Sequence, residues 1–381
     1  MNDLGRGRLP LVPTFGALIA VCAGSTAACG RSSEQSQARP HASVEVVAPI
    51  ASAPPAPKIP PGAIDPDAKE YPYPFEVRTF RFEGQRQPLV MAYLDETPAE
   101  PNGKTVVLLH GKNFSAAYWA PTIRSLTHAG YRVIAPDQIG FGKSSKPASY
   151  QYSFAELAGN TRSLLAAAGV SKSIVVGHSM GGMLAARYAL LFRDNSEKLL
   201  LVDPIGLEDY AAVVPHRSVD ELYRRELNQT ADKIRAYEKK AYFGGDWKPE
   251  YEELIALQSG WLLHPDYAKV AWAAALTADM IFTQPVVHDL GRLRLPTLLI
   301  IGQRDRAAVG KDAVPPEIGD KLGDFPALGK KAARAIPGAK LVEVAGAGHL
   351  PQIDSFPLYE KALLDFLASS DTRSIGGGPT R

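Results

Sequence analysis

Apolar runs rich in branched residues alternate with longer segments of helical spacing along most of the chain. The apolar runs lie at residues 106–110, 132–137, 173–179, 198–203, 297–302 and 340–346. Helical segments lie between several of them, as at residues 118–128, 154–168 and 180–192. Because strands that are apolar on both faces are typical of buried parallel sheets, this order predicts an α/β fold with a mostly parallel central sheet and helices on both of its faces.

Two stretches depart from this alternation. Residues 75–82 and 89–94 are separated by a short polar turn, which predicts an antiparallel hairpin before the parallel strands. Residues 207–288 are helix-rich and contain no apolar strand, so we expect a helical cap inserted into a core made of residues 67–206 and 289–370. The predicted cap carries several aromatic residues, namely Tyr223, Tyr237, Trp247, Trp261 and Trp272. Aromatic residues at helical spacing belong more often to a core than to a ligand site.

Residues 1–29 have the layout of a secretory signal. Arg6 and Arg8 precede an apolar stretch that ends in small residues, which predicts export. A membrane-spanning anchor is the alternative, and Pro10, Pro13 and the many Gly and Ala residues weaken it. The following residues, 30–66, are rich in Ser, Ala, Gln and Pro and predict a disordered tether. Residues 371–381 predict a flexible tail.

The chain has two cysteines, Cys22 and Cys29, and both fall within the predicted signal, so the mature protein has no disulfide framework. Residues 25–29 resemble a bacterial lipobox, although Thr26 stands where Leu is usual. Cys29 is therefore a lipidation candidate that would tether the protein to a membrane. Ordinary cleavage after an alanine, which gives a soluble enzyme, is the alternative. The predicted location is the periplasm or a membrane surface, with secretion as the alternative.

Composition and short motifs exclude several classes of ligand, namely nucleic acids, nucleotides and metal ions. The formal net charge of +2 with 22% charged residues does not indicate a nucleic-acid partner. Gly142, Lys143 and Ser144 spell the end of a phosphate-binding loop, but the first glycine of that motif would stand at position 137, which is Asp. No histidine or cysteine cluster has metal-ligand spacing, and no dinucleotide fingerprint is present. We therefore expect neither a metal nor a cofactor.

The segment GHSMG at residues 177–181 satisfies the G-x-S-x-G pattern and lies between an apolar strand and a helix. A sharp turn from strand to helix strains the backbone of the central residue and presents its side chain at the carboxyl edge of the sheet. The helix behind it directs its N-terminal dipole to the position where an oxyanion would form. This context predicts Ser179 as a nucleophile.

A serine hydroxyl needs a general base and an acid that orients the base. In a fold of this kind the acid and then the histidine follow the serine along the chain, each after a strand. Asp305 follows the apolar run at residues 297–302, and His349 lies in a Gly-rich turn after the last run. Asp203 also ends a strand and is the alternative acid. The remaining histidines lie in the predicted tether, helices or cap, or occupy structural motif positions; they are His41, His110, His128, His178, His216, His264 and His288.

An oxyanion needs two donors, which backbone amides commonly supply. The loop after residues 106–110 begins with Gly111 and continues with Lys112 and Asn113. We expect the N–H groups of Lys112 and Met180 to be these donors. Asn113 takes the place of Lys112 if the loop is shifted by one residue.

Five segments, HGKNF, DQIGFGKSS, GHSMGG, GQRD and GHLPQ, occur in an order that resembles the α/β-hydrolase fold family over about residues 75–367. The pattern is similar to its branch of esterases, carbon–carbon hydrolases and cofactor-free perhydrolases, which has a helical cap after the sixth strand. The resemblance implies a Ser-His-Asp triad. Epoxide hydrolases and haloalkane dehalogenases carry Asp at the nucleophile position, so Ser179 argues against both. Residues 307–327 form a longer connection than is usual in the family, which we expect to rim the pocket.

Together these features predict a serine hydrolase that cleaves a carboxylic ester or a related small acyl compound through an acyl-enzyme on Ser179. An aromatic-rich cap favours an apolar pocket. Two alternatives remain open at this stage: an acyltransferase or perhydrolase that uses the same triad, and a tethered lipoprotein whose hydrolase domain only binds a ligand.

Overall fold

A computed structural model describes residues 59–369. Its centre is one eight-stranded sheet with the strand order β1-β2-β4-β3-β5-β6-β7-β8. The strands are β1 (Arg78–Gly84), β2 (Gln87–Glu96), β3 (Thr105–Leu109), β4 (Arg132–Pro136), β5 (Ser173–His178), β6 (Ser196–Val202), β7 (Thr297–Gly302) and β8 (Lys340–Val344). β2 pairs antiparallel with β1 and β4, and the other pairings are parallel.

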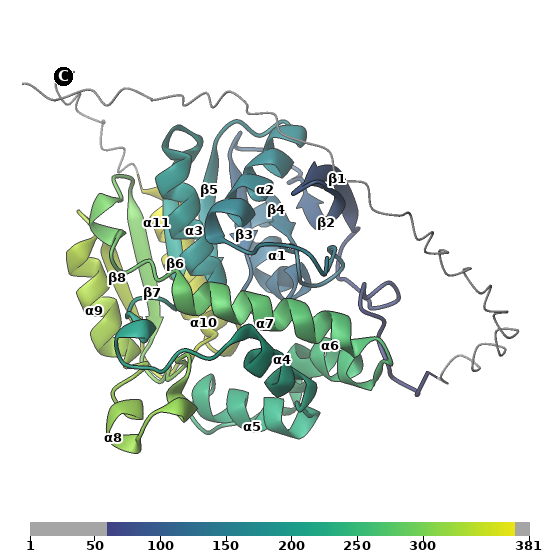
Figure 1. The fold of residues 1–381 in the computed structure, drawn as a ribbon. Coiled ribbons are helices and arrows are strands. Elements are labelled where there is room, and N and C mark those ends of the chain that lie inside the picture. The colour runs from purple at the N-terminus through teal and green to yellow at the C-terminus, as the bar shows by residue number, and fades with distance from the viewer. Residues whose placement is uncertain (1–58, 370–381) are drawn as a thin grey trace, which may run out of the picture. The chain divides into compact units, whose positions relative to one another are not determined.

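Helices cover both faces of this sheet (Figure 1). Those that connect the core strands or follow the last one are α1 (Ala120–His128), α2 (Phe154–Ala167), α3 (Met180–Leu191), α8 (Pro316–Gly319), α9 (Phe325–Ala335), α10 (Pro351–Asp354) and α11 (Phe356–Ala368). The sequence of β3 explains why both faces are covered: Val107 and Leu109 belong to one apolar cluster with α2, α3 and α9, whereas Val106 and Leu108 belong to another with α1 and α11. A strand that is apolar in both directions needs a helical layer on each side.

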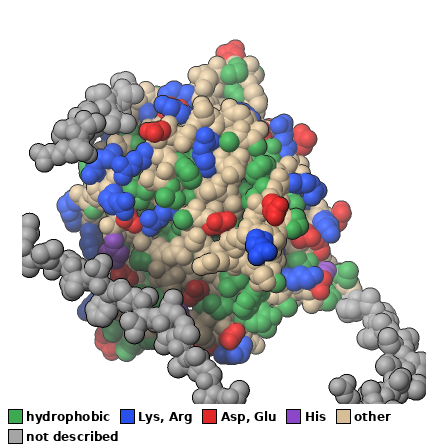
Figure 2. Space-filling view, turned by 45° about the horizontal axis from the view of Figure 1, so that its top comes forward, with side chains coloured by type: hydrophobic (Ala, Val, Ile, Leu, Met, Phe, Trp, Pro, Cys, Tyr) green, Lys and Arg blue, Asp and Glu red, His purple; other side chains and the backbone are tan. Residues whose placement is uncertain are grey.

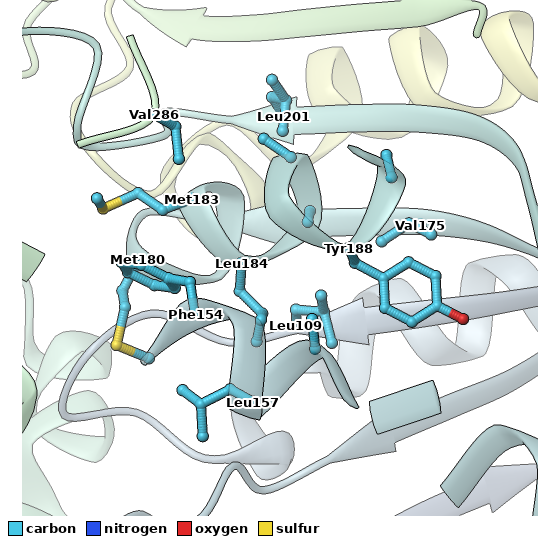
Figure 3. Packing of buried hydrophobic residues seen from close by; sticks show 14 of the residues in the cluster. Leu109, Phe154, Leu157, Val175, Met180, Met183, Leu184, Tyr188, Leu201 and Val286 are labelled. Carbon is cyan, nitrogen blue, oxygen red and sulfur yellow. The ribbon is translucent and has the colours of Figure 1, made fainter. Parts of the chain in front are cut away.

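Helix α3 is central to one of these layers. Figure 3 shows its residues Met180, Leu184 and Tyr188 among side chains from α2 and the strands. Its glycine-rich start and its small residues let the helix lie close to β5 and β6. The helix that follows the predicted nucleophile is therefore fixed by core packing.

Four α-helices stand between β6 and β7: α4 (Val219–Leu227), α5 (Ala231–Ala241), α6 (Glu252–Leu263) and α7 (Tyr267–Thr283). They gather on one side of the sheet, where α7 runs across its edge (Figure 1). The predicted fold class, a mostly parallel sheet with helices on both faces and an inserted helical cap, is confirmed.

The largest departures from the predicted elements lie near the beginning of the described chain. β1 starts at Arg78, three residues later than predicted. Residues 59–66, the last part of the predicted tether, contact α6: the N–H of Ile64 donates to the Gly260 carbonyl at 2.9 Å, and Trp261 Nε1 donates to the Asp65 carbonyl at 3.0 Å. These apolar and hydrogen-bonded contacts with a distant helix are not visible in the local composition.

The predicted signal, the lipidation candidate Cys29, most of the tether and the predicted tail from residue 371 onward lie outside the described residues. Within residues 59–369, no helix combines the length and the apolar character that a membrane span requires. On the face in Figure 2, basic and acidic side chains are both spread over the surface, in keeping with the formal net charge of +2.

Candidate active site

Ser179 lies at the turn between β5 and α3, with backbone angles φ 56° and ψ −120°. A positive φ is uncommon for a residue with a side chain and costs about 1–3 kcal/mol where the surroundings impose it. Here β6 and the first turn of α3 impose this conformation. The N–H of Ser179 donates to the Val202 carbonyl of β6, and the Ser179 carbonyl accepts from the N–H groups of Gly182 and Met183 in α3. Ser179 is 5% exposed and borders a large cavity.

The glycine two residues after Ser179 permits this turn. A Cβ atom on Gly181 would stand 2.1 Å from the Leu109 carbonyl oxygen of β3, a distance that real contacts do not reach. α3 can therefore approach the sheet closely at its first turn, and the first N–H groups of a helix have no acceptor within the helix. One of them belongs to Met180, directly after the predicted nucleophile.

Asp305 and His349 meet after β7 and β8. Asp305 Oδ2 lies 2.6 Å from His349 Nδ1, and Asp305 Oδ1 accepts from the N–H of Ala307 at 2.8 Å. Both side chains are buried, with 0% and 1% exposure. The other ring nitrogen, His349 Nε2, has no hydrogen-bond partner among the described residues, and His349 borders the same cavity as Ser179. Ser179 and His349 thus border one cavity, and Asp305 contacts His349 from the side of the ring opposite Nε2.

The alternative acid, Asp203, lies next to this pair but has another partner. Its carboxyl oxygens accept from the Gly302 N–H at 3.0 and 3.2 Å. Burial, followed by the neighbouring charge of Asp305, raises the pKa of Asp203 well above its usual range. Burial and this neighbouring carboxyl group therefore favour the neutral form of Asp203.

Two further histidines support the loops of the site. His178 Nε2 lies 2.8 Å from the His349 carbonyl and must carry the proton, so its Nδ1 accepts from the Tyr118 hydroxyl at 3.0 Å. His110 Nε2 accepts from the Gln138 N–H at 2.9 Å, so its Nδ1 donates to the Gly111 carbonyl at 2.8 Å. Burial lowers the pKa of His178 well below its usual range and also lowers the pKa of His110. Both rings are accordingly neutral structural groups.

The loop after β3 runs directly beside the serine. A Cβ atom on Gly111 would stand 3.1 Å from the Ser179 Cβ, so the backbone at this point borders the nucleophile. The N–H of Phe114 donates to the Gly111 carbonyl at 3.2 Å, which makes Lys112 and Asn113 the central residues of a turn. Asn113 has φ 72°, a conformation that Asn tolerates better than most residues.

The side chain of Lys112 is directed to the cap. Its Nζ donates to Asn113 Oδ1 at 3.1 Å and lies 3.2 Å from Glu226 Oε1 of α4. The sequence left the direction of this side chain open. The ion pair joins the predicted oxyanion loop to the helices above it.

The cavity at Ser179 has a volume of about 1070 Å³ and is bordered by the cap helices and by the connection after Asp305. This connection rims the pocket as predicted, since Val309, Lys311 and Pro316 are among its lining residues. Of the five cap aromatics named above, Tyr237 and Trp261 line the cavity. Trp247 and Trp272 donate their ring N–H groups elsewhere, to Glu252 and to the Ala148 carbonyl, and Tyr223 contacts the ring of Trp272.

Sequence reasoning missed two features of the cavity. Tyr242, just after α5, accepts the His349 N–H at its carbonyl at 2.7 Å, and the two rings are 4.5 Å apart. Glu238 and Gln258, from α5 and α6, are buried polar residues at the cavity wall. Neither feature has a motif, and helical periodicity alone gives no sign that these polar positions are buried. Among residues 59–369, no group of three or more His, Cys, Asp or Glu side chains could hold a metal ion.

The sequence model of the family described as the alpha/beta hydrolase fold matches residues 104–356. Among solved structures, a probable hydrolytic enzyme from Pseudomonas aeruginosa is 52% identical, with a TM-score of 0.80 over 81% of this chain and 99% of that chain.

Curated relatives are more distant. A putative carbamate hydrolase of Stutzerimonas stutzeri is 26% identical over 71% of this chain and 93% of its own length. A 2-hydroxy-6-oxo-6-phenylhexa-2,4-dienoate hydrolase of Burkholderia cepacia is 27% identical over 70% of this chain and 88% of its own length.

Proposed function

The chain belongs to the alpha/beta hydrolase fold family, and we propose that it is a serine hydrolase that cleaves carboxylic esters through an acyl-enzyme on Ser179. The observation that carries the proposal is the buried pair of His349 and Asp305, in which His349 Nδ1 lies 2.6 Å from Asp305 Oδ2. His349 Nε2 has no partner among the described residues, and His349 borders the same cavity as Ser179. A histidine oriented through Nδ1, with Nε2 available, is the arrangement that a serine nucleophile requires.

In the proposed first step, Ser179 Oγ attacks the ester carbonyl carbon and its proton passes to His349 Nε2. The negative charge moves to the carbonyl oxygen, where the N–H groups of Lys112 and Met180 stabilise it. The N–H of Asn113 replaces that of Lys112 if the substrate sits one residue further along the turn. Asp305 accepts from His349 Nδ1 throughout and stabilises the imidazolium.

Collapse of this intermediate breaks the ester bond, and the departing alkoxide takes the proton from His349. A water then attacks the acyl-enzyme and gives a proton to His349 Nε2. The second intermediate collapses to the carboxylic acid, and Ser179 Oγ recovers the proton. The cavity of about 1070 Å³ favours a small-molecule acyl substrate of drug-like size or larger.

Labelling with a fluorophosphonate probe tests the nucleophile. We expect the wild type to be labelled at Ser179 and the Ser179→Ala variant to remain unlabelled. A panel of acyl esters with graded chain length then defines the substrate, and competing alcohol or peroxide acceptors distinguish hydrolysis from acyl transfer. Equal labelling of the wild type and of Ser179→Ala would contradict the proposal.

We further propose that the protein is exported and tethered through a lipidated Cys29. The support is the sequence alone: a basic start, an apolar stretch and a lipobox-like segment at residues 25–29. Metabolic labelling with a radioactive fatty acid tests it. Labelled protein in the membrane fraction, and its loss in Cys29→Ser, is the expected result. Wild-type protein without a fatty-acid label would contradict the tether and favour the alternative, a soluble enzyme released by ordinary cleavage after an alanine.

A further inference from the structure

Two of the described residues that line the active-site cavity carry a buried side-chain atom without a hydrogen-bond partner. Among residues 59–369, the buried unpaired side-chain atoms that belong to cavity-lining residues are His349 Nε2 and Glu238 Oε2. The first is explained by the proposed reaction with Ser179. The second has no role in that reaction, although an unpaired buried carboxyl oxygen costs free energy.

Glu238 is 3% exposed and lies on the face of α5 that borders the cavity, together with Ile234 and Ala241. Its one side-chain partner among the described residues is Gln258 of α6, whose Nε2 donates to Glu238 Oε1 at 3.4 Å. Gln258 is also a buried cavity residue. An amide and a carboxyl group thus stand side by side in a mainly apolar wall.

The charge state of Glu238 follows from its surroundings. Burial raises the pKa of Glu238 to about 8, and the hydrogen bond from Gln258 offsets only part of this effect. None of the ion pairs of the described chain includes Glu238. Of the cationic side chains that line the cavity, Lys112, Arg217 and Arg225 pair with Glu226 and Asp312. Lys233, Arg306 and Lys311 donate to backbone carbonyls, and Lys240 also lines the cavity. Near neutral pH the carboxyl group is therefore mostly protonated and offers a hydrogen-bond donor.

Glu238 is also close to the reacting groups. It precedes Tyr242 by four residues, and its carbonyl accepts the Tyr242 N–H at 2.7 Å, so one helical turn separates the two. Tyr242 in turn holds the His349 loop. A substrate whose carbonyl lies at Ser179 can accordingly extend toward Glu238 within the same cavity.

We propose that Glu238, supported by Gln258, is a specificity-determining residue that donates a hydrogen bond to an uncharged oxygen in the part of the substrate remote from the scissile carbonyl. The ligand class is a hydroxyl, ether or carbonyl oxygen. This inference rests on the proposed ester hydrolysis. An ammonium group is the competing ligand, and it would require the carboxylate form that burial disfavours.

Matched p-nitrophenyl esters test the assignment. In each pair, one ester has a plain alkyl acyl chain, and the other has an ether oxygen in place of one methylene of that chain. The position of the oxygen is moved along the chain from one pair to the next. A third series of esters carries an ammonium group. The ratio of kcat/KM for the ether ester over the alkyl ester is measured for the wild type, Glu238→Gln, Glu238→Leu and Glu238→Met. Asp320→Leu is the matched control, because this exposed carboxylate borders the same cavity.

We expect the ratio to peak at one oxygen position and to fall roughly fivefold to tenfold there in Glu238→Leu and Glu238→Met. Glu238→Gln keeps a donor and should retain most of the preference, and Asp320→Leu should leave the ratio unchanged. Comparing ratios removes the electronic effect of the ether oxygen on the ester. Thermal unfolding checks that each variant is folded, and the Met variant replaces the Leu variant if the latter does not fold.

A binding measurement separates this inference from the proposed function. Calorimetric titration of Ser179→Ala with the corresponding alkyl and ether amides reports the same preference without hydrolysis, and the double variant Ser179→Ala, Glu238→Leu should lose it. Hydrolysis of the plain alkyl esters tests the proposed function on its own. Identical ratios in the wild type and Glu238→Leu at every oxygen position would overturn the inference, as would a Glu238-dependent preference for the ammonium series.

Discussion

The choice between two neighbouring acids can be decided by a pair of isosteric substitutions. Asp305→Asn keeps the shape of the side chain but removes the charge that faces His349 Nδ1 at 2.6 Å. The amide can present its NH₂ group to Nδ1, which places the histidine proton on Nε2 and prevents that atom from accepting the Ser179 proton. Asp203→Asn should act differently, because it resembles the protonated Asp203 that burial favours.

The expected size of the two effects follows from the same geometry. Opposite unit charges about 4 Å apart interact by about 4 kcal/mol at an effective dielectric constant of about 20, so loss of the Asp305 charge alone slows the reaction by about 10³-fold. The wrong tautomer adds to this, which gives a loss of roughly 10³ to 10⁴ in kcat. In Asp203→Asn the amide oxygen can still accept from Gly302 and the NH₂ group can donate to Asp305, so we expect a loss of less than about tenfold.

The assay is the initial rate of p-nitrophenyl acetate hydrolysis over a range of substrate concentrations, with the rate of fluorophosphonate labelling of Ser179 as a second readout. Asp203→Leu, which can neither accept from Gly302 nor donate to Asp305, controls for simple tolerance of the position. The reasoning fails if Asp203→Asn loses more than about 10³-fold while Asp305→Asn stays within about tenfold of the wild type. That result would make Asp203 the orienting acid.

Three further predictions concern stability. Burial raises the pKa of Glu238 from 4.5 to about 8, so its contribution to stability is full below about pH 4.5 and is lost as pH rises to about 8. Between pH 4.5 and 8.5, the free energy of unfolding of the wild type in urea should therefore fall by up to about 3–5 kcal/mol relative to that of Glu238→Gln. Parallel pH profiles of the two proteins would contradict this prediction. Gly181→Ala should cost more than about 2 kcal/mol in thermal or urea unfolding, because its Cβ would stand 2.1 Å from the Leu109 oxygen. Gly159→Ala in α2, where nothing lies within 4 Å of an added Cβ, should instead stabilise by about 0.4–1 kcal/mol.

Local chemistry explains why the serine was easier to predict than its partners. The turn at Ser179 is encoded within five residues, since the strand before it, the glycines beside it and the helix after it are adjacent in sequence. The acid is not encoded locally, because Asp203 and Asp305 both follow parallel strands that are neighbours in the sheet. Only the distance from Asp305 to His349, and the different partner of Asp203, separates the two candidates.

The cap shows where sequence reasoning reaches its limit. Glu238 and Gln258 lie twenty residues apart on different helices, and a polar residue on an amphipathic helix ordinarily indicates a solvated face. Their burial results from the packing of α5 against α6, which no short motif records. The same holds for residues 59–66, whose contacts with α6 depend on Ile64 and on Trp261 nearly two hundred residues later.

The cap is more than a cover over the cavity, because the end of α5 and the residues after it support the loop that carries His349. The backbone N–H groups of His349 and Arg306 donate to the carbonyls of Tyr242 and Ala241, at 2.7 and 3.1 Å, and the Arg304 side chain donates to the Gly244 carbonyl at 2.9 Å. These bonds join the loops after β7 and β8 to the end of α5 and to the residues that follow it. Any opening of the cap that left His349 in place would therefore have to occur at α4, α6 or α7, while α5 and its Glu238 stay fixed to the loops after β7 and β8. The proposed substrate selection at Glu238 and the proposed proton transfer at His349 would then share one rigid frame.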